Sequence, residues 1–307
     1  MGKTLLILLV GFSASFGILA RSKNERMLAS IDRMVDHFGD YATKNASTSG
    51  VYLALNRLYR DPAWRAGYNH RVLAGNAFSV TVEDHDDDAT LGSHYLRIRS
   101  SSSNVDAASL TEVTVFDSPF HKFAVWAKDT VISIAAEDSL GGENPNLIIQ
   151  NAPFMPKIDY GDLIDGLVAA ADDQGHVQTE EAFKPDDDYP NGNFYYFGLA
   201  PNVTHVKGNL RVEQGLTVYG IFIVEGNAQL ESGATVEGVL YFPNASSRLV
   251  HHGSGGSESL VKGGVVTWGY IDGSGGDIVV QHFPVYLRKF VSNYAPSNPP
   301  IRVLSWK

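Results

Sequence analysis

An acidic run at residues 83–88 has the side-chain types that bind a hard cation such as calcium. The candidate ligands within it are Asp84, Asp86 and Asp88. The common helix–loop–helix calcium template, however, needs a glycine where Ala89 stands and a bidentate glutamate where Tyr95 stands. We therefore interpret the run as a solvated acidic loop, with calcium binding as the alternative, and expect no metal and no other cofactor.

A second set of chemical groups repeats at a spacing of 18 residues. Glu213 is followed by Glu231, and Arg211 by Gln229, so stacked coils of this length would place each pair one above the other. Some β-solenoids that cleave acidic polysaccharides combine clustered acids with Arg or Lys on adjacent coils, which makes an enzyme one interpretation. A column of acids at one repeat position is more typical of a solvated ladder. We predict no catalytic residues and no enzyme activity.

Composition and missing motifs exclude several other kinds of site. The 307 residues contain no cysteine, which excludes disulfides, iron–sulfur clusters and thiol nucleophiles. His251 and His252 have no third metal ligand nearby, and neither a zinc-protease nor a serine-hydrolase motif occurs. The formal net charge is −10 and there is no basic tract. We therefore expect no nucleic-acid partner.

The elements that would position these groups are predicted from an internal repeat. Residues 208–220 (GNLRVEQGLTVYG) match residues 226–238 (GNAQLESGATVEG) at seven of thirteen positions. Eighteen residues with short strands between glycines are typical of one coil of a β-solenoid, with a single hairpin pair as the alternative. We expect earlier strands at 123–136 and 147–150 and later ones at 261–270 and 277–280. We also expect a helix at 160–171, a loop at 251–259 and a cap at 287–294.

The first 60 residues predict one long helix that begins with an apolar segment. Residues 4–20 carry no charge and would form ~26 Å of helix, at the short end of what spans a bilayer. Apolar residues then recur in steps of three and four, and no proline occurs before Pro62, so one helix can continue to this point unless Gly39 or Gly50 bends or ends it earlier. The apolar side chains that we assign to an assembly helix are Leu5, Leu6, Leu8, Leu9, Phe12, Phe16, Leu19, Met27, Ile31, Met34 and Phe38. A plain single-pass anchor with a stalk is the alternative.

A small sheet is predicted after this helix. Three short alternating runs, at residues 77–83, 95–100 and 112–116, are separated by polar loops. A helix followed by such a meander is typical of many α+β modules.

The N-terminal residues resemble a known family. Residues 2–58 are similar to the N-terminal part of PilX-type minor pilins of type IV pilus systems, through the apolar opening, the triplet at 25–27 (ERM) and the small-residue patch before Ala54. The ending IRVLSWK resembles the tail of PilX-like proteins with glycine-rich β-solenoid heads. The resemblance implies cleavage by a prepilin peptidase after Gly2 and packing of the helix in a filament core. Two positions depart from the family: Lys3 replaces an apolar residue and Ile7 replaces a glutamate.

The missing glutamate has a consequence within this resemblance. In most pilins it is thought to neutralise the N-terminal amine of a neighbouring subunit. A buried charge without a partner costs several kcal/mol, and no acid precedes Glu25 here. We expect the chain to lie where its N-terminus is not enclosed, such as a tip, or in a filament that neutralises the amine differently.

Together these patterns predict an α+β chain in three regions: a membrane and assembly helix (1–60), a small pilin-like sheet region (61–120) and a β-solenoid-like head with insertions (121–307). The predicted function is that of a structural subunit of a type IV pilus-like filament on the bacterial cell surface, reached through the inner membrane. Its expected partners are copies of itself or other pilins, the inner membrane before assembly, and surface or carbohydrate ligands of the head. A membrane-anchored envelope scaffold and an anchored polysaccharide-active enzyme are the alternatives.

Overall fold

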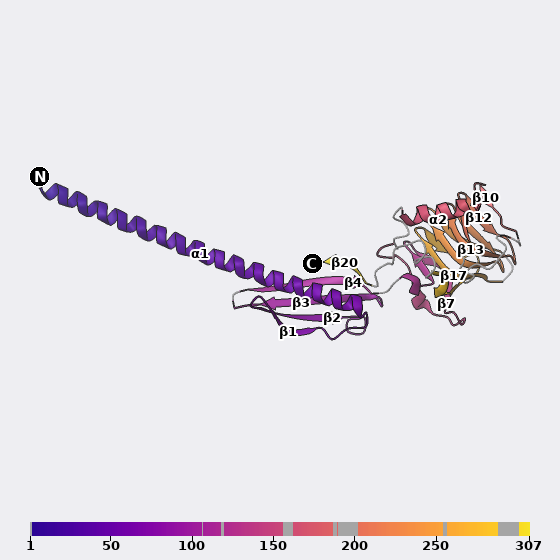
Figure 1. The fold of residues 1–307 in the computed structure, drawn as a ribbon, viewed down its shortest axis with the longest axis horizontal. Coiled ribbons are helices and arrows are strands. Elements are labelled where there is room, and N and C mark those ends of the chain that lie inside the picture. The colour runs from indigo at the N-terminus through magenta and orange to yellow at the C-terminus, as the bar shows by residue number, and fades with distance from the viewer. Residues whose placement is uncertain are drawn as a thin grey trace. The chain divides into compact units, whose positions relative to one another are not determined.

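The computed structural model describes residues 2–105, 107–117, 120–155, 162–186, 189, 202–253, 257–287 and 301–307. The chain divides into two compact units (Figure 1), and each is described by itself. One unit comprises Met1–Asp117 and Pro300–Lys307, and the other comprises Ser118–Pro299. The second unit is therefore inserted, in sequence, into the first.

The first unit begins with α1 (Gly2–Arg60), a single helix of 59 residues that is about 88 Å long. It ends directly before Asp61 and Pro62, as predicted. Gly50 does not interrupt it, because this glycine lies on the face that packs against the sheet. A Cβ added there would be 2.8 Å from Phe78 and would overlap Ser100, so the glycine allows a close approach of helix and sheet.

The helix packs on a five-stranded antiparallel sheet with the order β1-β2-β3-β4-β20. Its strands are β1 (Tyr68–Leu73), β2 (Asn76–Glu83), β3 (Tyr95–Ser103), β4 (Ala108–Phe116) and β20 (Arg302–Trp306). The three predicted runs are β2, β3 and β4, whereas β1 was not predicted. Residues 301–307, which the sequence pattern assigns to the head, instead complete this sheet by pairing with β4. The pairing joins segments almost 200 positions apart, which no local pattern encodes.

The core of the first unit lies between the last four turns of α1 and one face of the sheet. The helix contributes small or medium side chains at steps of three and four, and the strands contribute alternate residues. The buried members are Val51, Ala54, Leu58, Phe78, Val80, Val82, Leu96, Ile98, Val113, Val115 and Ile301.

The second unit is a parallel β-solenoid with two sheets. The six-stranded sheet has the order β10 (Ala182–Phe183), β12 (Asn209–Val212), β14 (Ala228–Glu231), β16 (Arg248–His252), β18 (Tyr270–Asp272) and β6 (Val131–Ile132). The path of the nine-stranded sheet is β7 (Ile134–Glu137), β19 (Ile278–His282), β17 (Ser259–Thr267), β15 (Thr235–Phe242), β13 (Thr217–Val224), β11 (Val203–Val206) and β9 (Val177–Gln178). Beside this path, β5 (Val125–Ala127) pairs with β17 and with β8 (Ile148–Ile149).

The predicted 18-residue repeat is confirmed by the strand register. Thr217 pairs with Thr235 and Leu210 with Ala228, each in a parallel ladder. The described helical segments of this unit are α2 (Asp162–Asp173), the 3₁₀ turns η1 (Phe120–Lys122) and η2 (Pro145–Leu147), and residues 284–287. α2 overlaps the predicted helix at 160–171 and extends two residues beyond it. Residues 160–161, 254–256 and 288–294 of the predicted helix, loop and cap lie outside the described residues.

The strands that come first in this unit do not stack before the repeats. β6 pairs with β18 and β7 with β19, so residues 131–137 lie beside the last coil rather than beside the first. The chain then starts its coils at the opposite end, at β9 and β10, next to β11 and β12. An alternating strand can pair with either end of a parallel stack, and the early strands here cover the edge that the last coil would otherwise expose.

A column of glycines runs through the long strands. Gly220, Gly238 and Gly263 are in register, with φ values of 139°, 151° and 149°. Such backbone angles favour glycine, and a Cβ at Gly263 would overlap the carbonyl oxygen of Gly238. Before the glycine, buried and half-buried residues alternate, and after it every residue of β13 and β15 is buried. The interior holds Val218, Val236, Val261, Phe222, Leu240 and Phe242 among its fully buried residues.

Candidate functional site

Two surfaces bear on function, and the first is the part of α1 that leaves the sheet (Figure 1). We call it the assembly surface. Its large apolar side chains are exposed, with exposed fractions from 46% at Ile31 to 73% at Ile7, and 67% at Leu6. The other predicted members are exposed as well: Leu8, Leu9, Phe12, Phe16, Leu19, Met27, Met34 and Phe38. The exposure of Gly2 and of the Leu5 side chain lies outside what the structure describes. Clustered apolar exposure of this extent marks a surface that another molecule or a membrane covers.

The assembly surface also has the composition of a membrane span. Among the described residues, α1 is the one helix long and apolar enough to cross a membrane, and its most apolar window is not buried. Gly11 and Gly17 have no side chain or neighbouring segment within 4 Å of where a Cβ would be. Together with Ser13 and Ala14, they form the small-residue positions that would let a second helix approach closely.

The sheet end of α1 shows a different face. Thr43, Ala46, Ser47, Val51 and Ala54 are buried against the strands, so this face is built from small residues. The hydroxyl oxygens of Ser47 and Thr111 are 2.7 Å apart, which links helix to sheet by a buried hydrogen bond. The helix therefore packs against the sheet at its C-terminal end and is exposed over its N-terminal part.

Two of the three candidate calcium ligands, Asp84 and Asp88, form ion pairs with arginines. The Asp84 carboxylate accepts a hydrogen bond of 2.8 Å from Arg65, and that of Asp88 pairs with Arg97 at 2.5 Å. The bond from Arg65 lowers the pKa of Asp84. Bonds from the Thr90 hydroxyl and backbone, and then from Arg97, lower the pKa of Asp88 to about 2. Among the described residues no group of three potential ligands could hold a metal ion, Asp86 included.

The pair of Asp88 and Arg97 belongs to an ion network that the sequence analysis did not predict. Arg97 and Arg99 project from β3 between Glu83 of β2 and Glu112 of β4, with Arg99 2.9 Å from Glu112 and 3.0 Å from Glu83. The Arg99 bond lowers the pKa of Glu112. The signal was present as an Arg-x-Arg pair on one strand with acids on both predicted neighbours. Cross-strand pairs of this kind stabilise a sheet face that remains in water.

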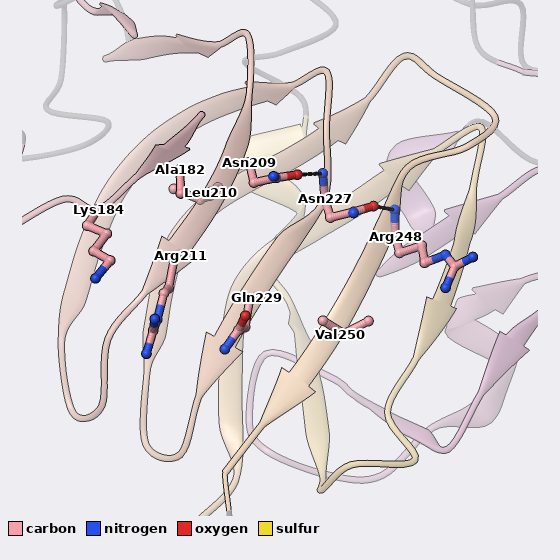
Figure 2. A pocket seen from close by; sticks show the side chains of 9 residues that line it. All are labelled: Ala182, Lys184, Asn209, Leu210, Arg211, Asn227, Gln229, Arg248 and Val250. Atoms are coloured by element: carbon pink, nitrogen blue, oxygen red, sulfur yellow. Dashed lines mark hydrogen bonds between the residues drawn. The ribbon is translucent and has the colours of Figure 1, made fainter. Parts of the chain in front are cut away.

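The second surface is a groove on the six-stranded sheet of the solenoid, which we call the solenoid groove (Figure 2). It has a volume of 430 Å³, within the range of about 300–1,000 Å³ that is usual for ligand sites. It crosses β10, β12, β14 and β16. Its lining residues are Ala182, Lys184, Asn209, Leu210, Arg211, Asn227, Gln229, Arg248 and Val250.

An asparagine ladder forms one side of the groove. The side-chain oxygen of Asn209 accepts a 2.8 Å hydrogen bond from the backbone N–H of Asn227, and that of Asn227 accepts a 3.0 Å bond from Arg248 N–H (Figure 2). The Gly-Asn start of each repeat is the sequence signal for this ladder. The glycine is required because a Cβ at Gly226 would lie 2.5–2.6 Å from the coil before it.

The cations of the groove are held by neighbours. Arg211 donates from Nε to Glu231 at 2.6 Å, and the Lys184 ammonium lies 3.5 Å from Glu213. The Arg248 guanidinium lies over the Tyr270 ring, 4.7 Å from its centre. The two acids considered as catalytic candidates, Glu213 and Glu231, lie on adjacent coils. Each of them is paired with a cation. Lys184 and Arg248 were not predicted as groove residues, because their strands lack the Gly-Asn signature.

No protein-family model matches the chain, and no curated protein matches it in sequence. A structural comparison finds the crystal structure of the competence-associated pilin ComZ from Thermus thermophilus. The TM-score is 0.28 and the sequence identity 10%, over 88% of this chain and 97% of that chain. A TM-score of this size does not support a functional assignment. The assignment rests on the geometry of the helix, the sheet and the solenoid.

Proposed function

We propose that the chain is a pilin-type structural subunit that assembles into a filament through α1 and displays the solenoid as its head. The single observation that carries this is the contrast along one continuous helix. Its C-terminal turns are buried against the sheet, while the preceding turns expose an apolar surface.

The physical driving force is the cost of that exposure. Each large apolar side chain gains about 1.5–3 kcal/mol on burial, and the assembly surface carries at least ten of them. A bilayer satisfies this surface before assembly. Neighbouring helices would replace the lipid in a filament through van der Waals contact, helped by Gly11 and Gly17.

The position of acidic residues limits where the subunit fits. Along α1 the first acid is Glu25, which is paired with Arg21 at 3.0 Å in water-exposed surroundings. No carboxylate is available at Ile7 to neutralise a neighbour's N-terminal amine. We therefore propose that the chain lies at the filament tip or is a minor subunit, in line with the resemblance to PilX-type minor pilins. The bacterial cell surface is the corresponding location.

The N-terminus of the protein in sheared surface material tests this proposal. A mature chain that begins at Lys3, recovered with filaments, would support processing after Gly2 and assembly. An unprocessed chain found in membranes alone would contradict it and favour an anchored scaffold. Because the chain contains no cysteine, Phe16→Cys provides a second readout: labelled with a thiol-specific photocrosslinker, it should crosslink to neighbouring pilin subunits in filaments, whereas the same label at Ser274→Cys on the head should not.

A further inference from the structure

The solenoid groove has the form of a site for an extended chain rather than a compact molecule. It crosses four neighbouring parallel strands, which are about 4.8 Å apart, so it runs for about 14 Å along the stack of coils. The outward-facing lining residues form two rows along the stack, Asn209, Asn227 and Arg248 in one and Arg211, Gln229 and Val250 in the other, so polar side chains recur from coil to coil (Figure 2).

The polar groups presented are cations and amides, and no acid occurs among the described lining residues. Lys184, Arg211 and Arg248 supply three positive charges, while Gln229 lies between two of them. Glu231 bonds one side of the Arg211 guanidinium and thereby orients it, which leaves further N–H donors of that group for a ligand. Arg248 is held by the Tyr270 ring and has no ion pair within the described residues. Cations oriented in advance bind carboxylates with less loss of side-chain entropy.

The amides suit hydroxyl groups. Each ladder bond uses the side-chain oxygen of Asn209 or Asn227, so the NH₂ group of each asparagine remains a donor. Gln229 has no hydrogen bond to the described residues and offers both a donor and an acceptor. A polymer with hydroxyls between spaced carboxylates matches this alternation.

Nucleic acid matches it less well. Single-stranded nucleic acid is bound on aromatic platforms, and no aromatic side chain lines the groove among the described residues.

We propose that the solenoid groove binds a linear acidic polysaccharide, with its carboxylates on Arg211, Arg248 and Lys184 and its hydroxyls on Gln229 and the asparagine ladder. This goes beyond the filament role and is independent of it, because the head would bind such a chain whether or not the subunit assembles.

The test uses the full chain in detergent and polygalacturonate as the probe, with affinity measured by calorimetry. Arg248→Gln should weaken binding by about tenfold, the loss expected for one charge-assisted contact, and added salt should weaken it further. Arg211→Gln should do the same. Lys262→Gln is the matched control, since Lys262 also pairs with a glutamate of the adjacent coil, Glu237 at 3.1 Å, but on the other sheet. It should leave the affinity within twofold.

Four results would overturn the proposal. They are no binding of polygalacturonate, equal binding of its fully methyl-esterified form, equal weakening by Lys262→Gln, and single-stranded DNA of matched length binding as tightly or more tightly. Melting temperatures show whether each variant is folded. Arg248→Gln removes no ion pair among the described residues and should leave the fold intact.

Discussion

Large apolar side chains are buried in the solenoid but exposed on the assembly surface of α1. In the solenoid, Leu240 and Phe222 are completely buried by the chain's own coils. On the assembly surface, Leu19 and Phe16 are more than 60% exposed, although they are equally apolar. A coil is covered by the coil before and after it, whereas the described residues of the first unit leave the helix uncovered where it extends beyond the sheet. The solenoid thus buries its large apolar side chains within its own coils, and the exposed part of the helix requires a membrane or another molecule to cover it.

The sharpest way to break this comparison is to shorten one leucine in each region. Leu240→Ala should lower the free energy of unfolding by ~2–5 kcal/mol, because it leaves a cavity between coils. Leu19→Ala should change it by no more than ~0.5 kcal/mol, because the side chain is exposed, but should reduce the yield of filaments. Chemical unfolding of the detergent-solubilised chain measures the first effect and sheared surface material the second. Similar unfolding losses in both variants would contradict the comparison.

A somewhat smaller effect is expected at the glycine column. Gly263→Ala should destabilise the solenoid by ~2–3 kcal/mol, since it combines a strained φ with overlap onto Gly238. Gly175→Ala is the control: it has a positive φ of 71° but open space around it, and should cost ~1 kcal/mol. Thermal unfolding followed by circular dichroism compares them. Equal losses would mean that the close stacking of coils at this column contributes nothing.

The asparagine ladder should have a more modest role. Asn227→Ala removes the acceptor for the Arg248 N–H and should cost about 1–2 kcal/mol. Gln229→Ala, two residues further along the same coil, removes a side chain that forms no hydrogen bond to the described residues and should be close to neutral. The difference in denaturation midpoint between these two variants measures the ladder, and no difference would assign the Gly-Asn repeat to the glycine alone.

The smallest effect concerns pH in the first unit. The pKa of Asp88 is about 2, below the ordinary value of 3.8, so its charged form stabilises the folded state above about pH 4. This contribution is lost as the pH falls from about 4 to about 2. Asp88→Asn should therefore show a flatter fall of melting temperature over that interval than the wild type, with Asp86→Asn as the control. Because Asp88 is exposed, solvent screening keeps the effect small. Parallel curves for Asp88→Asn and wild type would exclude the contribution.

The sequence predicted one part of the candidate site. The repeat placed Arg211 beside Gln229 and Glu213 beside Glu231, and the strand register agrees. It could not show that Glu231 reaches back to Arg211, because the two positions are 20 residues apart and meet through the coil geometry alone. Lys184 and Arg248 join the groove from strands whose sequences differ from the repeat. Likewise, the acidic run suggested carboxylates facing one another, whereas Arg65 and Arg97 come from outside the run to pair with Asp84 and Asp88.

The sequence by itself determined the elements whose information is local and periodic. These are the uninterrupted helix up to Arg60, its apolar stripe, three strands of the small sheet and the 18-residue coil. Only the tertiary structure decided that β20 returns to β4 and that β6 and β7 pair with the last coil instead of preceding the first. The physical reason is that backbone hydrogen bonds between strands are the same for every partner. The choice of partner therefore depends on which edges remain uncovered once the rest of the chain has packed.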